Sequence, residues 1–89
     1  MRVLRYTVPI DDDVHVIDCG RIVHVDCRER EAVTFWAVDT GSLKRTLQVF
    51  GTGQPIPDGW EIIGTALSPD MTFVARGALV WHLAEIAAF

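Results

Sequence analysis

The sequence predicts an all-β fold, a single small antiparallel sandwich or barrel of about seven strands formed by residues 1–89. Segments rich in Val, Ile, Thr and aromatic residues recur at spacings of about eight to twelve residues. Clusters of Gly, Pro, Asp and Ser separate these segments and are typical of turns. No segment shows a convincing apolar period of about 3.6 residues, so amphipathic helices are not expected. A chain of 89 residues suffices for one core and therefore one domain.

The first predicted strand covers residues 2–8, where polar side chains alternate with β-branched and aromatic ones. Pro9 ends this strand because proline cannot donate a ladder hydrogen bond. The acidic run Asp11-Asp12-Asp13 follows. It lacks the alternating oxygen ligands and the internal glycine of a calcium loop, so we interpret it as a solvated turn.

Residues 14–17 and 22–25 predict a β-hairpin with a tight turn at Gly20. Both segments alternate apolar and polar side chains, as half-buried strands do. The register of this hairpin would set His15 opposite His24 on one face. Two imidazoles about 5 Å apart across a strand pair can share a metal ion, so His15 and His24 are candidate metal ligands.

Metal binding is not expected from the sequence. The pair His15 and His24 would need a third protein ligand such as His82, and no sequence feature brings His82 to it. Cys19 and Cys27 are separated by seven residues and lack the CxxC spacing that zinc sites favour. We interpret the two cysteines as free thiols, too far apart on the predicted hairpin to form a disulfide.

Residues 32–38 are almost continuously apolar, which predicts a strand covered on both faces. A turn at residues 39–42 would reverse the chain into a further strand at residues 43–50. That hairpin would place Trp36 across from Arg45. A guanidinium over an indole ring stabilises a packed corner and is also a candidate ligand-stacking site.

Residues 51–60, called the connector below, are dense in glycine and proline. Gly51 and Gly53 allow positive φ, while Pro55 and Pro57 hold the backbone extended and remove two donors. Rigid loops beside aromatic and Arg residues make efficient contact points. The candidate binding residues are Trp36, Arg45, Thr52, Gly53, Gln54, Ile56 and Trp60.

Residues 61–67 predict the next strand, in which Gly64 indicates a bulge or a close backbone contact. Residues 71–75 would extend a hairpin, and the alternation at 78–84 predicts the last strand. The apolar tail at 85–89 is short, and we expect a final helical turn there.

Composition excludes several partners. With a net charge of −4, a pI near 5.1 and scattered basic residues, the chain lacks the clustered Lys and Arg of a nucleic-acid-binding surface. No apolar run approaches the roughly 20 residues of a membrane span, and the first residues lack a signal pattern, so a cytosolic protein is expected. Hydrophobic residues make up 49% of the chain, which favours self-association through exposed apolar surface.

Catalytic motifs are missing from the sequence. Gly-Thr-Gly at 51–53 is not followed by the Lys-Ser/Thr and helix that a P-loop requires. Ser42 and Ser68 lie in predicted turns without a Gly-x-Ser-x-Gly elbow. We therefore predict a protein that is not an enzyme, with no catalytic residues and no cofactor.

Five motifs stand out along the chain: Tyr6-Thr7-Val8-Pro9, Ile22-Val23-His24-Val25, Thr34-Phe35-Trp36, residues 49–57 and Val80-Trp81-His82-Leu83. Together they resemble a family of small proteins without assigned activity that are encoded mainly by actinobacterial bacteriophages. The resemblance covers most of the chain. Gln54 stands where many members have His, Ala84 replaces Phe, the turn near Gly20 is shortened, and residues 68–77 resemble an insertion. The first difference argues against His-based chemistry at the connector.

The resemblance implies a phage accessory protein made in the cytoplasm of the infected host. The leading hypothesis is a non-enzymatic protein–protein interaction module that forms homo-oligomers and contacts a host protein, without nucleic-acid or membrane partners. The alternative is a small-molecule binder that sequesters a nucleotide, with an anion at the N–H groups of Thr52 and Gly53. Arg45 would then be the counter-charge, and Trp36 or Trp60 the stacking face. A minor virion component is a further alternative.

Overall fold

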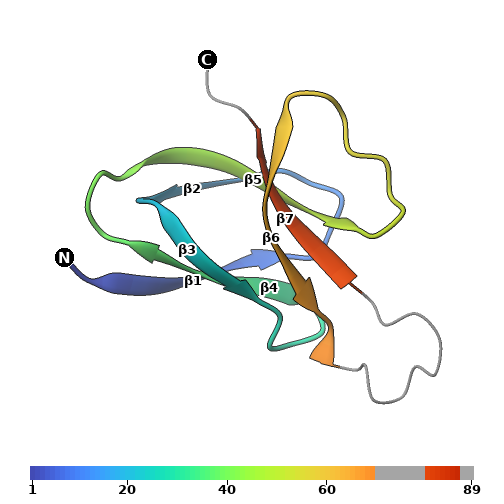
Figure 1. The fold of residues 1–89 in the computed structure, drawn as a ribbon, viewed down its shortest axis with the longest axis horizontal. Helices are drawn as coiled ribbons and strands as arrows, with labels where there is room; N and C mark the ends of the chain where they lie inside the picture. Colours follow the sequence, from blue (N-terminus) through green and yellow to red (C-terminus); the bar gives the residue numbers. More distant parts are fainter. Residues whose placement is uncertain (70–79, 87–89) are drawn as a thin grey trace.

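The structure, a computed structural model, describes residues 1–69 and 80–86 (Figure 1). The described residues form seven strands in two sheets, which confirms the all-β prediction and gives it the form of a sandwich. The strands are β1 (Val3–Pro9), β2 (His15–Cys19), β3 (Ile22–Asp26), β4 (Ala32–Val38), β5 (Leu43–Gly51), β6 (Trp60–Leu67) and β7 (Val80–Ile86).

Each sheet is antiparallel and has its most apolar strands at the centre. Sheet A has the order β1-β4-β3, and sheet B has the order β2-β5-β7-β6. β4 lies between β1 and β3, and side chains of these neighbours shield part of its outward side. Thr34 and Val38 are buried although they face away from the core, whereas Trp36 on the same side is half-buried, so the predicted cover on both faces is present only in part.

The core lies between the two sheets and is built from alternate residues of the central strands. Phe35 of β4 is fully buried and stacks on Tyr6 of β1, with ring centroids 5.1 Å apart. Opposite them, Leu47 of β5 and Leu83 of β7 are also fully buried. Burying such side chains stabilises the fold by about 1.5–3 kcal/mol each. The remaining buried members are Val8, Cys19, Val25, Cys27, Val33, Ala37, Val49 and Ala66.

The predicted hairpin of residues 14–17 and 22–25 is wrong. β2 pairs with β5 and β3 pairs with β4, so His15 lies opposite Leu47 and His24 lies opposite Trp36. Gly20 carries the chain from one sheet to the other, and its N–H donates to the carbonyl of Val38 over 3.0 Å. A Cβ at this position would collide with that carbonyl oxygen. The crossing is favoured over a hairpin because β2 in sheet B and β3 in sheet A then present their apolar residues to one core from opposite sides.

The second predicted hairpin, at residues 32–50, is also wrong. The turn exists, with Gly41 at φ 66°, but it joins β4 of sheet A to β5 of sheet B. The place beside β4 is taken by β1, whose Arg5 lies opposite Trp36. Arg45 lies opposite Ile17, so the expected corner of Trp36 and Arg45 does not form. Alternation along one strand does not specify its neighbour, which is why the pairing failed.

The carboxyl-terminal strands follow the prediction with shifted boundaries. β6 carries the expected irregularity, because its register against β7 shifts between Ile62 and Gly64. The last strand is described from Val80 and ends at Ile86, so Glu85 and Ile86 extend β7 where a helical turn was expected; residues 78 and 79 of the predicted strand lie outside the described residues. The rest of that turn, residues 87–89, and the expected hairpin at 71–75 lie outside the described residues.

Candidate functional site

The connector begins with a tight turn that is closed by the side chain of Gln54. The N–H of Gln54 donates to the carbonyl of Gly51 over 3.0 Å, and the Gln54 side-chain oxygen accepts from the N–H of Gly51 at 3.0 Å. Gly53 sits inside this turn at φ 89°, a conformation that favours glycine. The Gln54 side-chain oxygen is therefore used to hold the turn.

His82 of β7 fixes the connector to sheet B. Its Nε2 lies 2.8 Å from the hydroxyl of Thr52 in the connector, and its Nδ1 lies 2.9 Å from the hydroxyl of Thr65 in β6. The N–H of Thr52 also donates to the carbonyl of Val80 over 3.1 Å. Both ring nitrogens are occupied by hydroxyls, so this imidazole is a structural clamp and not a base oriented by a carboxylate.

The sequence does not indicate that His82 and Thr65 belong to this group. The alternation of β7 already places His82 on the opposite face from the buried Leu83. What it does not show is that the connector and β6 flank that face. This neighbour relationship arises from the pairing of Phe50 and Thr65 with His82 on the two sides of β7.

A second, smaller apolar layer lies on the outer face of sheet B. Phe50 and Ala84 are buried, yet they alternate with the core residues Val49 and Leu83 and belong to the opposite face. The ring of Trp60 packs edge-on against Phe50, with centroids 5.5 Å apart. The last residue of the connector is therefore anchored to the sheet.

Large apolar side chains beside this layer are exposed. Ile62 is 46% exposed, Leu67 51% and Val16 61%. The strand register puts all three on the outer face of sheet B, since Ile62 lies opposite the outward-facing Ala84 and the neighbours of Leu67 and Val16 face the core. Outer face B denotes this surface, made of the outward-facing residues of sheet B and the connector.

The candidate binding residues separate into two groups. Five of them, Thr52, Gly53, Gln54, Ile56 and Trp60, lie together in the connector at outer face B. Trp36 lies instead on sheet A, with its ring 5.4 Å from the ring of His24. The structure therefore does not bring Trp36 to the connector.

Arg45 is occupied by an internal ion pair. Its Nη1 lies 3.0 Å from each carboxylate oxygen of Glu85, and its Nε donates to the carbonyl of Gly20 over 3.0 Å. Both side chains are largely buried, 17% and 16% exposed. Arg45 ties β5, β7 and the sheet crossing together and is not placed as a counter-charge for a ligand.

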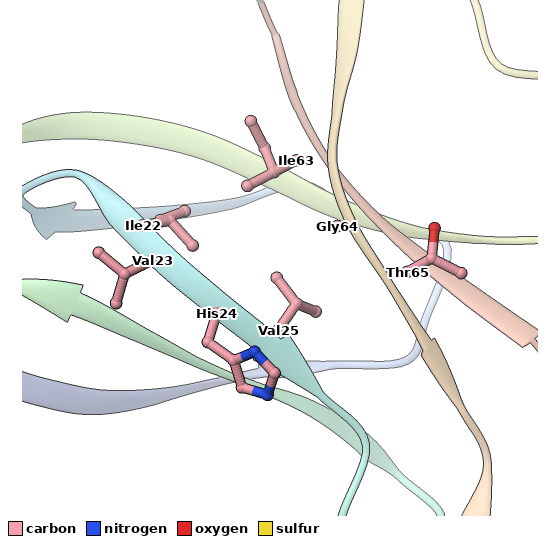
Figure 2. Close-up of a pocket in the computed structure, with 7 residues that line it drawn as sticks. All are labelled: Ile22, Val23, His24, Val25, Ile63, Gly64 and Thr65. Atoms are coloured by element: carbon pink, nitrogen blue, oxygen red, sulfur yellow. The ribbon is translucent and has the colours of Figure 1, made fainter.

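A shallow hollow of about 290 Å³ lies where the edge strands β3 and β6 approach each other (Figure 2). Gly64 permits this approach, because a Cβ there would lie 2.5 Å from Cγ2 of Val25. Most lining side chains are apolar, and the set offers no cluster of charged groups. The lining residues are Ile22, Val23, His24, Val25, Ile63, Gly64 and Thr65.

Three of the described groups have shifted pKa values. The hydrogen bond from His15 holds the pKa of the Asp11 carboxyl below its ordinary value of 3.8, and the N–H of Asp13 adds to this. The N–H and guanidinium of Arg2 lower the pKa of Asp39 in the same way. Burial raises the pKa of the Cys19 thiol above 9.0.

The described residues contain neither a metal-binding cluster nor a membrane-spanning helix. Within residues 1–69 and 80–86, no three His, Cys, Asp or Glu side chains gather into a set that could hold a metal ion. No helix in this part of the chain has the length and apolarity needed to cross a bilayer.

Comparison with known proteins places the chain in a family. The profile of DUF7352, a domain of unknown function, matches residues 1–88. No curated protein and no solved structure shows significant similarity to the chain. The protein therefore belongs to the DUF7352 family over nearly its whole length.

Proposed function

We propose that the protein is a non-enzymatic protein-binding module that contacts its partner through outer face B. The observation that carries this proposal is the set of exposed apolar side chains on that face, Ile62 and Leu67 on β6 and Val16 on the opposite edge strand β2, together with the anchored Trp60. Exposed apolar surface gathered on one face is a feature of interaction sites. Aromatic anchors near such a surface supply much of the binding free energy.

Outer face B is also preorganised, which reduces the entropy lost on binding. The connector is held by the Gln54 turn, by the two hydroxyl contacts of His82 and by the packing of Trp60 on Phe50. A partner therefore meets a surface whose loop is already fixed. No reacting group is needed for this activity, in keeping with the use of both His82 nitrogens inside the clamp.

The resemblance to phage-encoded proteins supports a more specific form of the proposal. The module would be a phage accessory protein that acts on a host protein in the cytoplasm of the infected bacterium. Self-association through the same face would be a competing use of this surface, because a face that excludes water against a partner does so against a second copy as well.

Affinity purification from infected cells, with quantitative mass spectrometry, tests the proposal. Ile62→Glu places a charge on outer face B, on the edge strand β6, and Val3→Glu is the matched control on the edge strand β1 at the outward side of sheet A, where Val3 is 53% exposed. We expect a host protein that is captured by the wild type and by Val3→Glu and lost with Ile62→Glu. Equal capture by both variants, or recovery of the bait alone, would refute the proposal.

The other two hypotheses have separate tests. The nucleotide-binding constellation at the connector lacks two of its members, since Arg45 pairs with Glu85 and Trp36 lies on sheet A. A thermal-shift screen against nucleotides measures any residual binding there. The virion hypothesis is tested by mass spectrometry of purified particles.

A further inference from the structure

We propose that the outer side of sheet A carries a second binding site, which holds the phosphate group of a small aromatic ligand such as a nucleoside monophosphate. The site is a hollow of about 250 Å³, here called the anion hollow, lined by Arg5, Thr7, Arg28, Glu29 and Thr34. It lies on a different sheet from outer face B and does not depend on the protein-binding proposal.

Strand register builds the floor of the anion hollow. Thr7 of β1 lies opposite Thr34 of β4, and Arg5 lies opposite Trp36 one row along. These residues alternate with Val8, Val33 and Phe35, which face the core, so they occupy the outward side. Two threonines and one arginine thereby share the outward side of two paired strands.

The loop after β3 supplies the second guanidinium, and Cys27 holds that loop. The N–H of Cys27 donates to the Asp26 carboxylate over 2.8 Å. Its thiol donates to the carbonyl of Glu29 at 3.2 Å and contacts that of Ala32 at 3.6 Å. Arg28 lies between the two ends of this hydrogen-bonded segment, so its backbone position is fixed before a ligand arrives.

The charges in the anion hollow favour an oxyanion. Arg2 and Arg45 pair with Asp39 and Glu85, whereas Arg5 and Arg28 have no ion-pair partner within residues 1–69 and 80–86. The lining of the anion hollow therefore carries two guanidiniums and one carboxylate, that of Glu29, although the net charge of the whole chain is −4. Guanidinium groups bind tetrahedral phosphate oxygens with charge-assisted hydrogen bonds, and threonine hydroxyls add donors.

The size of the hollow and its neighbours define the rest of the ligand. A volume of about 250 Å³ lies below the roughly 300–1,000 Å³ of pockets that enclose whole drug-sized ligands, so only the anionic group is enclosed. The half-buried ring of Trp36 lies in the next row, beside Arg5 and tilted 41° to His24. A planar base extending from the phosphate would meet this ring, and stacking on aromatic side chains is a common mode of base binding.

Titration of the ¹⁵N-labelled protein with adenosine monophosphate, inorganic phosphate and adenosine tests the site. We expect saturable amide shifts at Thr7, Thr34 and Arg28 with both phosphates, stronger binding of the nucleotide, and no binding of adenosine at millimolar concentration. Arg5→Gln and Arg28→Gln should each weaken nucleotide binding by about tenfold or more. Lys44→Gln, an equal charge change on sheet B, should leave it unchanged.

Glu29→Gln gives the opposite expectation, since removing this carboxylate from the hollow should strengthen binding severalfold. Circular dichroism confirms that each variant is folded, and the two arginine variants are independent of each other. Absence of saturable shifts with both phosphates, equal binding of adenosine, or full binding by either arginine variant would overturn the proposal. Ile62→Glu should bind the nucleotide normally, so failure of the protein-binding proposal is distinguishable from failure of this one.

Discussion

The hydroxyl of Thr52 is the part of the His82 clamp that belongs to the connector. It lies 2.8 Å from Nε2 of His82 and 3.4 Å from the carbonyl oxygen of Val80. Side-chain hydrogen bonds of this kind contribute about 0.5–1.5 kcal/mol to stability. They also decide whether a glycine-rich loop keeps one conformation.

Thr52→Val removes the hydroxyl with little change in side-chain shape. We expect the free energy of unfolding to fall by about 0.5–1.5 kcal/mol, because the hydrogen bond to His82 is lost. Urea denaturation measures this change. Thr40→Val, at an exposed turn, is the control and should have almost no effect. An equal loss in both variants would contradict the clamp.

The thiol of Cys19 makes the stability of the fold depend on pH in the alkaline range. Burial raises the pKa of its thiol above 9.0, although the nearby Arg45 partly opposes this shift. The folded state thus favours the neutral thiol, while the unfolded state ionises near the ordinary value. This contribution to stability is complete below about pH 9 and is lost as pH rises through the folded-state pKa.

Urea denaturation between pH 7 and 11 checks this linkage. We expect the wild type to lose stability above about pH 9 more steeply than Cys19→Ala, whose stability is lower at neutral pH but lacks this titration. Comparing the two curves removes the effects of other groups that titrate in the same range. Parallel curves would show that the Cys19 thiol does not contribute.

At the scale of elements, Gly64 controls how closely β6 approaches β3. A Cβ there would lie 2.5 Å from Cγ2 and 2.8 Å from Cβ of Val25. Both strands lie at sheet edges, and their approach closes one side of the sandwich (Figure 1). This contact fixes how the sheets face each other on that side.

Gly64→Ala should lower the free energy of unfolding by about 1–3 kcal/mol, because the added methyl group overpacks the β3–β6 contact. Thermal or urea denaturation measures the loss. In the Val25→Ala background the same substitution should be less harmful, since the contact with Cγ2 is gone and only the contact with Cβ remains. A loss independent of residue 25 would point to backbone effects in β6 instead.

The elements also show how far the sequence can be read. Strand positions were predictable, since β-branched alternation and turn residues are local signals, and β4 was predicted with its exact bounds. Strand partners were not. His15 and His24 were expected to face each other across a hairpin, and they lie in different sheets because the chain crosses at Gly20.

The candidate site was likewise predictable only where its residues are close together in the sequence. Thr52, Gln54 and Trp60 lie together because they share one short loop, which the sequence shows directly. Trp36 and Arg45 could join them only through strand pairing, which depends on the assembled core. The contact of His82 with Thr52 was not predictable for the same reason, since it spans 30 positions along the chain.

At the scale of the whole molecule, the two outer sides of the sandwich differ in character. Outer face B exposes aliphatic side chains such as Ile62 and Leu67. The outer side of sheet A instead presents Arg5 opposite Trp36 and, in the neighbouring row, Thr7 opposite Thr34. An 89-residue domain thus offers two unlike surfaces, and the two proposals can be tested on one folded protein.

The crossing at Gly20 also orders the events of folding. All strands of sheet A lie within residues 3–38, so this sheet has every partner once Val38 has been synthesised. β2 lies inside the same stretch but must wait for β5, and β5 in turn pairs with β7 near the end of the described chain. Such non-local pairing is characteristic of domains that fold in milliseconds to seconds. During translation, β2 therefore stays unpaired beside a sheet that is already able to form.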